Sequence, residues 1–484
     1  MSDKRSWVAT TRRYVAYGAF VAAVSLVPGR AAAEKVVVNA DGWQIFTDGR
    51  AGGFVSHAYG DGYPQPRYGV DPTTGMYVVV DTPQEGAGFR SISENGLLVD
   101  PNTTGGTLIY DQGTINLTRV RSGFVSNIFG FGIRGKLTEW TTLSVYLQFW
   151  SFIENDGRQK NLPNNADVRQ GWAKLEGPWG SFTAGRVRGL FSRGNTDIDV
   201  LYAHRWGVGW PGALDNKGPS LGQLSFGVLG AGFSAGMVYV TPSLGGLQLN
   251  IGAFDPVQLQ GYGNFTRTKY ARPEAELTFE RPFASGWGKV ALFANGVWQK
   301  VYPDSYCNPM VLEPVTNKNL PCDATVAGVG YGGRLELGRF HLGASGFYGQ
   351  GLGLKYALEV SEAAQDRKGN LRRSKGVHVQ GQVVLGKVDL FAGWGIALID
   401  LTDYDRRATI QDPRDPMNPA AQVFQYTMIK HQMGVNAGVV YNVTPNLHID
   451  LDFFRAEALW YLVNNLPQQK QVVWVGNAGM MISW

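Results

Sequence analysis

Hydrophobic and polar residues alternate with a period of two along much of the chain. Between residues 377 and 398, one face of the alternation is entirely apolar or small, while the other carries polar side chains such as His378 and Gln380. Successive side chains of a β-strand point to opposite faces, so this pattern predicts strands with one apolar and one polar face. Gly386 and Lys387 interrupt the pattern, which indicates a two-residue turn within a long β-hairpin.

The same design recurs around other short turns. The sequence predicts seven of them, at residues 138–141, 177–180, 242–246, 282–288, 338–339, 386–387 and 444–446. Eight long polar segments lie between them, at residues 58–118, 154–167, 188–230, 256–268, 302–325, 352–373, 401–427 and 461–469. Seven short and eight long connections join sixteen strands, the last of which runs from residue 470 to 484.

Short turns at one end and long loops at the other are typical of β-barrels of bacterial outer membranes. The fold class predicted here is therefore all-β, a sixteen-stranded antiparallel transmembrane β-barrel. Beyond the N-terminal segment no stretch approaches 18 consecutive apolar residues, so helical membrane spans are not expected. The strand ends carry tryptophans that fit an interfacial aromatic girdle, namely Trp140, Trp179, Trp287, Trp474 and Trp484.

Composition and charge narrow the functional classes. The 484 residues are 44% apolar, 12% aromatic and 17% charged, which excludes a disordered chain and is low in charge for an ordinary cytosolic enzyme. The net charge is +5, but residues 1–33 hold five basic residues against one acidic residue. The remaining 39 basic and 38 acidic residues nearly cancel, so no nucleic-acid partner is expected.

The N-terminal segment has the design of a secretory signal. A basic leader precedes an apolar core at residues 15–27, and Ala31, Ala32 and Ala33 close the segment. We expect residues 1–33 to be a signal peptide cleaved before Glu34 and residues 34–484 to form the barrel. The alternative, an N-terminal membrane anchor, fits less well because the apolar run is short and interrupted.

The chain has two cysteines, Cys307 and Cys322, in one Pro- and Asn-rich stretch. An exported protein meets oxidising conditions, so the expectation is one local disulfide. The six histidines are scattered along the sequence, and neither a metal site nor a cofactor is expected.

Several segments resemble the general porins of Gram-negative outer membranes. Residues 42–50 read GWQIFTDGR, residues 131–135 read FGIRG, and residues 169–186 read RQGWAKLEGPWGSFTAGR. Residues 239–246 resemble the hairpin that follows the third loop of that family. The apolar stripe of the last strand resembles the family's assembly signal, although the chain ends in Trp484 instead of Phe.

This resemblance implies a homotrimer of water-filled channels in the outer membrane, surrounded by lipid and lipopolysaccharide, for passive diffusion of small hydrophilic solutes. It also implies that the third long loop folds into the barrel and narrows it. By position in the motifs, Arg50 and Arg169 match basic wall residues of the constriction, facing acids such as Asp197 and Asp199 on that loop. Arg186 matches a position near the subunit interface.

Two features of the chain depart from the family pattern, and two other functions are alternatives to a diffusion channel. Gly130 stands where many relatives have another wall arginine, and the usual Pro-Glu-Phe signature of the inward loop is missing. A substrate-selective channel for a sugar, phosphate or organic anion is the alternative, in which Tyr202, Trp206 and Trp210 would form an aromatic track in the lumen. A barrel enzyme is not expected, because no nucleophile motif has a suitable context.

Overall fold

The computed structural model describes the barrel and parts of its connections. The described residues are 34–62, 67–70, 77–81, 113–124, 127–151, 153, 166–200, 222–257, 267–284, 286–303, 310, 312–313, 318–319, 321–354, 364–366, 368–407, 409–411, 422–424, 429–461 and 468–484. The expected signal segment, Cys307 and the three loop aromatics Tyr202, Trp206 and Trp210 lie outside these residues.

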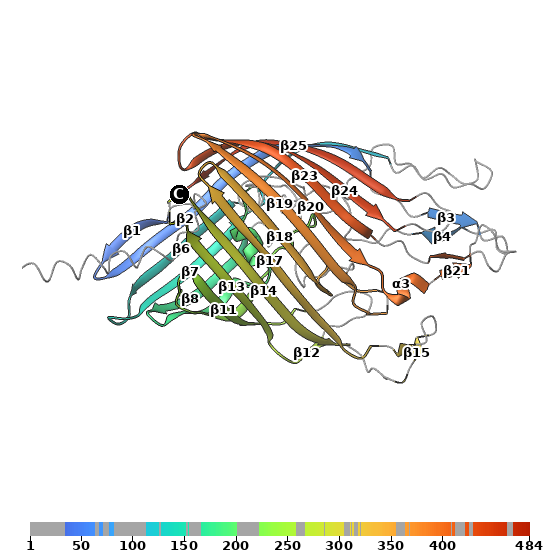
Figure 1. Cartoon of the computed structure of the whole chain (residues 1–484), viewed down its shortest axis with the longest axis horizontal. Coiled ribbons are helices and arrows are strands. Elements are labelled where there is room, and N and C mark those ends of the chain that lie inside the picture. Colours follow the sequence, from blue (N-terminus) through green and yellow to red (C-terminus); the bar gives the residue numbers. More distant parts are fainter. Residues whose placement is uncertain are drawn as a thin grey trace, which may run out of the picture.

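One large antiparallel sheet closes on itself (Figure 1). Its strands are β1 (Lys35–Ala40), β2 (Trp43–Asp61), β5 (Thr114–Arg121), β6 (Asn127–Lys136), β7 (Thr142–Ser151), β8 (Ala166–Gly177), β9 (Gly180–Arg188), β10 (Phe233–Val240), β11 (Leu247–Phe254), β12 (Arg267–Thr268), β13 (Arg272–Pro282), β14 (Gly288–Tyr302), β17 (Ala324–Leu337), β18 (Phe340–Gln350), β19 (Arg373–Leu385), β20 (Val388–Asp400), β23 (Ile429–Asn442), β24 (Leu447–Trp460) and β25 (Lys470–Ser483).

These strands occupy sixteen positions around the barrel, which confirms the predicted fold class. Along one edge β2 pairs first with β6 and then with β5, so β5 and β6 are two halves of one position. Along its other edge β2 pairs with β1 and then with β25, which closes the ring end to end. The short β12 pairs with β14 beside β13 and extends the position of β13.

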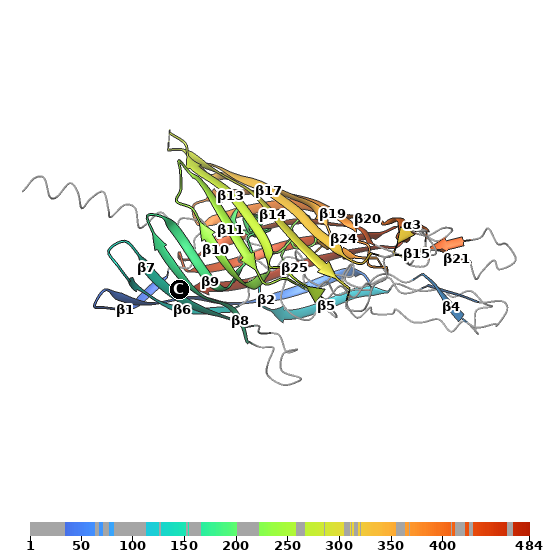
Figure 2. The ribbon, with the colours of Figure 1, turned by 90° about the horizontal axis from the view of Figure 1, so that it is seen from below.

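All seven predicted short turns join consecutive strands at one end of the barrel, here called the turn end. The eight long connections leave from the opposite end, here called the loop end. Figures 1 and 2 show α3 (Asp403–Arg407), β15 (Leu312–Glu313) and β21 (Thr409–Gln411) beyond the loop end. The other small elements are β3 (Arg67–Val70), β4 (Tyr77–Asp81), β16 (Lys318–Asn319), β22 (Gln422–Phe424) and α2 (Arg193–Asp197).

The outer surface of the barrel is apolar, as the alternation predicts for a wall in contact with lipid. Outward side chains such as Val329, Leu342, Phe453 and Ile482 are about half exposed or more. Tryptophans are exposed near the turn end at Trp43, Trp140, Trp179 and Trp287, and near the loop end at Trp298 and Trp474. None of the helices that the structure describes is both long and apolar enough to span a membrane.

The inward face divides into a polar part and an apolar part. Polar side chains such as His378, Gln380 and Asn436 face inward and are buried. Toward the loop end, however, the inward face of β14, β17, β18, β20, β23 and β24 is apolar and forms the largest buried cluster of the described residues. Loop residues cover both parts, so the interior is not uniformly open to water.

Candidate functional site

The connection between β9 and β10 enters the barrel, as the resemblance implied, in both of its described parts, residues 189–200 and 222–232. Its first part forms the single-turn helix α2, which packs on the inner face of β14. Gly194 in α2 lies against the ring of Phe293, where a larger side chain has no room. Farther along, the backbone N–H of Val200 donates a 3.0 Å hydrogen bond to Gln380 of β19. The described start of the loop, residues 189–200, therefore lies inside the lumen instead of leaving the barrel.

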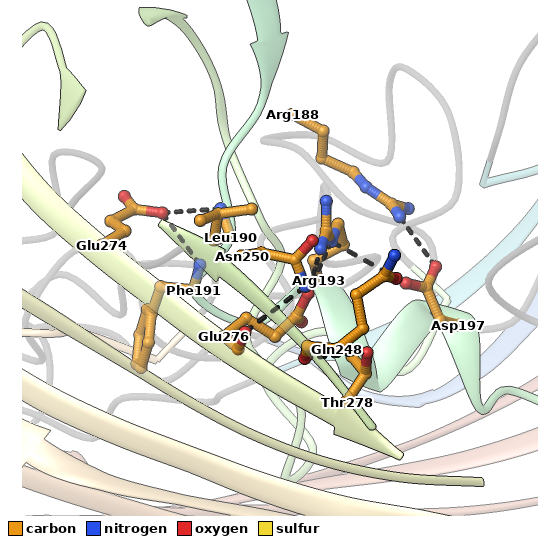
Figure 3. A network of polar contacts seen from close by, with 10 residues as sticks. All are labelled: Arg188, Leu190, Phe191, Arg193, Asp197, Gln248, Asn250, Glu274, Glu276 and Thr278. Carbon is orange, nitrogen blue, oxygen red and sulfur yellow. Dashed lines mark hydrogen bonds and ion pairs between the residues drawn. The ribbon is translucent and has the colours of Figure 1, made fainter. Parts of the chain in front are cut away.

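A network of charged side chains fixes the start of this loop to the wall (Figure 3). The guanidinium of Arg193 donates to the carboxylate of Glu276 on β13, with a 2.9 Å bond from Nε. Asp197 accepts a 2.7 Å hydrogen bond from Arg188 and lies 3.9 Å from Arg193. Burial alone would lower the pKa of Arg193, but Glu276 and Asp197 raise this pKa overall, so the guanidinium stays charged.

A second carboxylate of β13 holds the loop by its backbone. Glu274 accepts hydrogen bonds from the N–H groups of Leu190, at 2.6 Å, and Phe191, at 2.8 Å. The same carboxylate accepts a 2.8 Å bond from Arg272, which keeps its charge paired. Hydrogen bonds to a charged acceptor each contribute about 1.5–3 kcal/mol, so Glu274 sets the direction in which the chain leaves β9.

The returning part of the loop crosses to the opposite side of the interior. Phe226 packs edge to face on Phe454 of β24, with 5.1 Å between the ring centroids. Its backbone lies directly against Gly395 of β20, and its side chain lies against Gly434 of β23. Both glycines face inward, and a Cβ at Gly395 would collide with the Phe226 carbonyl. Glycine at these positions therefore provides the room that the loop needs.

The structure places Arg50 and Arg169 in one row on the wall away from α2. Arg50 of β2 pairs in register with Ile128 of β6, which pairs with Trp150 of β7. Arg169 lies at an irregularity between β7 and β8, and its guanidinium is 4.6 Å from the centre of the Trp150 ring. A 2.8 Å ion pair joins Arg169 to Asp167 on its own strand.

The expected acids lie on the other side of the interior. Arg50 and Arg169 occupy the first and fourth barrel positions, whereas α2 packs against β14 and β17 at the ninth and tenth. The backbone of Asp197 is thus held near that wall, where Arg334 of β17 donates to its carbonyl at 3.4 Å, while its carboxylate binds Arg188 of β9 at the fifth position. Asp199 is only 4% exposed, so its carboxylate has little contact with water in the pore.

Sequence reasoning missed a ladder of hydrogen bonds on the wall beside Arg50. Tyr146 donates to Asp48 at 2.7 Å, Gln148 donates to the Tyr146 hydroxyl at 2.9 Å, and Trp150 donates to Gln148 at 2.7 Å. The Asp48 carboxylate and the Tyr146 hydroxyl occupy the space that a side chain at position 130 would need. Gly130, noted from the sequence as a departure, was the available signal for this ladder.

The remaining predicted sites can be placed only in part. Arg186 is exposed on the outer face of β9, and its Nε donates a 3.2 Å hydrogen bond to the backbone carbonyl of Arg169. Cys322 lies just before β17, while Cys307 is outside the described residues. The described part of the chain contains no group of three or more His, Cys, Asp or Glu that could hold a metal ion.

The wall of the barrel is closed, and the inward loop narrows its interior. Charged residues lie on both sides of the remaining space. Such an arrangement can order water and pass charged or polar solutes, because opposed charges create a field across a narrow aqueous gap. It offers no activated nucleophile within the network of Figure 3, where the acids are paired with arginines or backbone N–H groups.

Comparisons with known proteins agree with the barrel fold. The family model described as Gram-negative porin matches residues 21–472. The solved outer membrane channel DcaP of Acinetobacter baumannii is similar at a TM-score of 0.55 and 11% identity, over 92% of this chain and 100% of that chain. An anion-selective porin from Comamonas acidovorans has a TM-score of 0.50 and 12% identity, over 91% and 100%. A sequence comparison with curated proteins gave no match.

Proposed function

This chain belongs to the Gram-negative porin family and forms an outer-membrane diffusion channel, and we propose that it passes small hydrophilic solutes and ions. The observation that carries this proposal is the inward loop held by Glu274 and Glu276, which narrows the barrel and leaves charged residues on the facing wall. The proposal contains no catalytic step and no cofactor. Conductance of the purified protein in a planar bilayer tests it.

We assign the constriction of this channel to Arg50 and Arg169 on the wall and to Asp197 and Asp199 on the inward loop. The support is the common row of both arginines beside Trp150 and the attachment of α2 to the facing wall. Solutes passing this level would meet positive charge on the first four strand positions, which biases ion entry.

A second candidate function, an anion-selective channel, is favoured by the charge of that wall. The inward face of β2, β5, β6 and β8 carries seven basic residues against three acidic ones: Arg50, Arg119, Arg121, Arg134, Lys136, Arg169 and Lys174 against Asp48, Asp167 and Glu176. A wall with surplus positive charge raises the local concentration of anions. The solute class then includes small carboxylates or phosphate, in addition to inorganic anions.

The functional unit is proposed to be a homotrimer, a general property of porins. Arg186 supports a contact on β9, because it is an exposed cation on the outer face. Depending on its depth, an arginine that faces lipid costs up to about 2–4 kcal/mol. A neighbouring subunit would remove Arg186 from lipid and give it polar partners.

The outer-leaflet partner is proposed to be lipopolysaccharide, through its phosphate groups. The outer face of the loop end carries Lys300, Lys375, Arg455 and Lys470 beside exposed aromatic or apolar residues. Cations at the level of lipid head groups attract anionic lipid. Arg455 also lies 5.4 Å from the ring centre of Trp474, one of the outward tryptophans.

We also propose that the N-terminal segment is removed and that the two cysteines form a disulfide. Removal of residues 1–33 would leave Glu34 at the start of the mature protein, directly before β1. Arg134 of β6 binds the Glu34 carboxylate at 2.7 Å, so the proposed mature terminus is already fixed to the wall. A disulfide between Cys307 and Cys322 is proposed for the loop between β14 and β17, and the described residues include no free cysteine.

A further inference from the structure

The apolar cluster inside the loop end is unexpected in the interior of a channel. Its wall residues include Val301 of β14, Val326 of β17, Ile399 of β20 and Trp460 of β24, all 1% exposed or less. Inward side chains with so little exposure do not line water. Toward the loop end, water is therefore excluded from the part of the wall that these residues form.

Loop residues fill this side of the interior. Leu352 and Leu354, from the connection between β18 and β19, are buried in the cluster together with Phe191 and Leu229 of the inward loop. Leu352 packs against Gly328 of β17, an inward glycine where a Cβ would collide with the leucine side chain. The β18–β19 connection and the inward loop thus narrow the loop end of the barrel by the packing of apolar side chains, not by charge.

A buried ion pair ties the connection between β18 and β19 to the next long connection. The Arg372 side chain is 1% exposed and donates two hydrogen bonds of 2.7 Å to Asp405 in α3. It also donates to the carbonyl of Gln365. The fork of a guanidinium matches a carboxylate in two bonds, so this pair fixes both distance and orientation.

A second set of bonds ties the same two connections. Thr402 donates a 2.6 Å hydrogen bond to Asp366, and Asp366 also accepts from the N–H groups of Lys368 and Asn370. Thr402 and Asp405 cap α3 reciprocally, at 3.0 and 3.1 Å. The neighbours Leu371 and Leu401 pack directly against the apolar cluster. The hydrogen-bonded residues that join the two connections and the apolar cluster are therefore parts of one packed unit.

We propose that Arg372, acting through Asp405, sets a size limit at the extracellular mouth, separate from the constriction formed by the inward loop. Arg372 is a positioning residue in this inference, because it holds the two connections in place while Leu352 and Leu354 occupy the space. The inference rests on the proposed channel function. The proposed size limit is a second filter of the channel, which selects solutes by size and not by charge.

Removing one partner of this pair should release the two connections. A buried ion that loses its partner strongly disfavours the arrangement that buries it, by about two orders of magnitude in the equilibrium between fixed and released loops. Wild-type channels should then show one main conductance level. Channels with Arg372→Met or Asp405→Asn should visit a higher level, because released loops expose the space now filled by the cluster.

The test compares single-channel conductance and the exclusion limit for neutral polyethylene glycols of graded size. The variants are Arg372→Met, Asp405→Asn and the conservative Arg372→Lys, each checked for β-barrel content by circular dichroism. Arg373→Met is the matched control, because Arg373 directly follows Arg372 in the chain and its side chain is exposed at the start of β19. Leu352→Ser tests the cluster itself without touching the ion pair.

The inference predicts a larger exclusion limit and higher conductance for Arg372→Met, Asp405→Asn and Leu352→Ser, with unchanged ion selectivity. The Arg373→Met control should match the wild type, and Arg372→Lys should lie between the wild type and Arg372→Met. Equal exclusion limits in all folded variants would overturn the size filter while leaving the channel function intact. A wild-type protein that does not conduct would instead overturn the proposed function, and the inference with it.

Discussion

Individual charged residues in the interior have defined neighbours. Arg169 has Asp167, Trp150 and Phe233 around its guanidinium, and Asp197 has Arg188 and Arg193. Each pair lies beside water, so solvent and salt limit its energy to about 1 kcal/mol. Conduction is more sensitive than stability to these charges, because every ion crosses the same local field.

Replacing Arg169 with Ala should shift ion selectivity toward cations, since it removes one positive charge from the narrow row. Replacing Asp197 and Asp199 together should shift selectivity toward anions. Reversal potentials in a salt gradient measure both effects, and Arg169→Lys, which retains the charge, is the control. Unchanged potentials in both variants would place the constriction elsewhere.

The inward direction of Arg50 follows from strand alternation, and motif position pointed to Arg169. The irregularity that accompanies Arg169 did not follow, because an extra residue in one strand leaves no trace in a short polar stretch. Glu274 and Glu276 were also missed, although they alternate on β13. Their role depends on a loop some eighty residues earlier in the chain, and sequence spacing gives no information on such a contact.

Among the structural elements, the short turns were the most predictable and the loops the least. A turn follows from local residues such as Gly338, whose φ of 56° suits glycine. The inward course of residues 189–200 follows instead from tertiary contacts with β13, β14 and β19. The apolar inner wall was hidden because Ala397 and Ile399 lie within a run that is apolar on both faces.

Replacing Glu276 with Gln should loosen the inward loop without unfolding the barrel. Arg193 would lose its main carboxylate partner, and breaking a buried ion pair costs about 3–5 kcal/mol. The expected results are greater open-channel current noise and faster proteolytic cleavage within residues 189–232. Glu280→Gln is the control, because Glu280 lies on the same strand in a more exposed pair with Lys289. Equal noise and cleavage in both variants would show that Glu276 does not anchor the loop.

Reducing the proposed disulfide should affect one loop only. Closing a loop of about 15 residues stabilises by roughly 3 kcal/mol in the chain-entropy model, far less than the continuous sheet contributes. The barrel should therefore keep its circular dichroism spectrum and its resistance to heat after reduction. Thiol labelling before reduction supplies the check, since free thiols in protein from oxidising conditions would contradict the pairing of Cys307 with Cys322.

At the scale of the whole molecule, the closed sheet explains why the fold could be predicted from the sequence. Each strand of the ring pairs with neighbours on both sides, and β25 returns to β2, so no long edge remains unpaired. The count of connections fixed the number of strands because it needed only turn positions. The count of connections gives no information on whether several barrels assemble.

Native mass spectrometry in mild detergent should show three copies of the chain. Replacing Arg186 with Glu should weaken that assembly, because it places an acidic group where a cation is proposed to contact a neighbouring subunit. Lys136→Glu is a comparison at the turn end, where the side chain is exposed. Only monomer in the wild-type spectrum would contradict the trimer, and an unaffected trimer in Arg186→Glu would remove this residue from the interface.

The central claim is that the barrel is an open, narrowed channel, and conductance in a planar bilayer with neutral solutes of increasing size tests it most directly. The account predicts stepwise ohmic conductance that small polymers reduce and polymers above a sharp size limit leave unchanged. Absence of conductance steps from correctly folded protein would contradict the account.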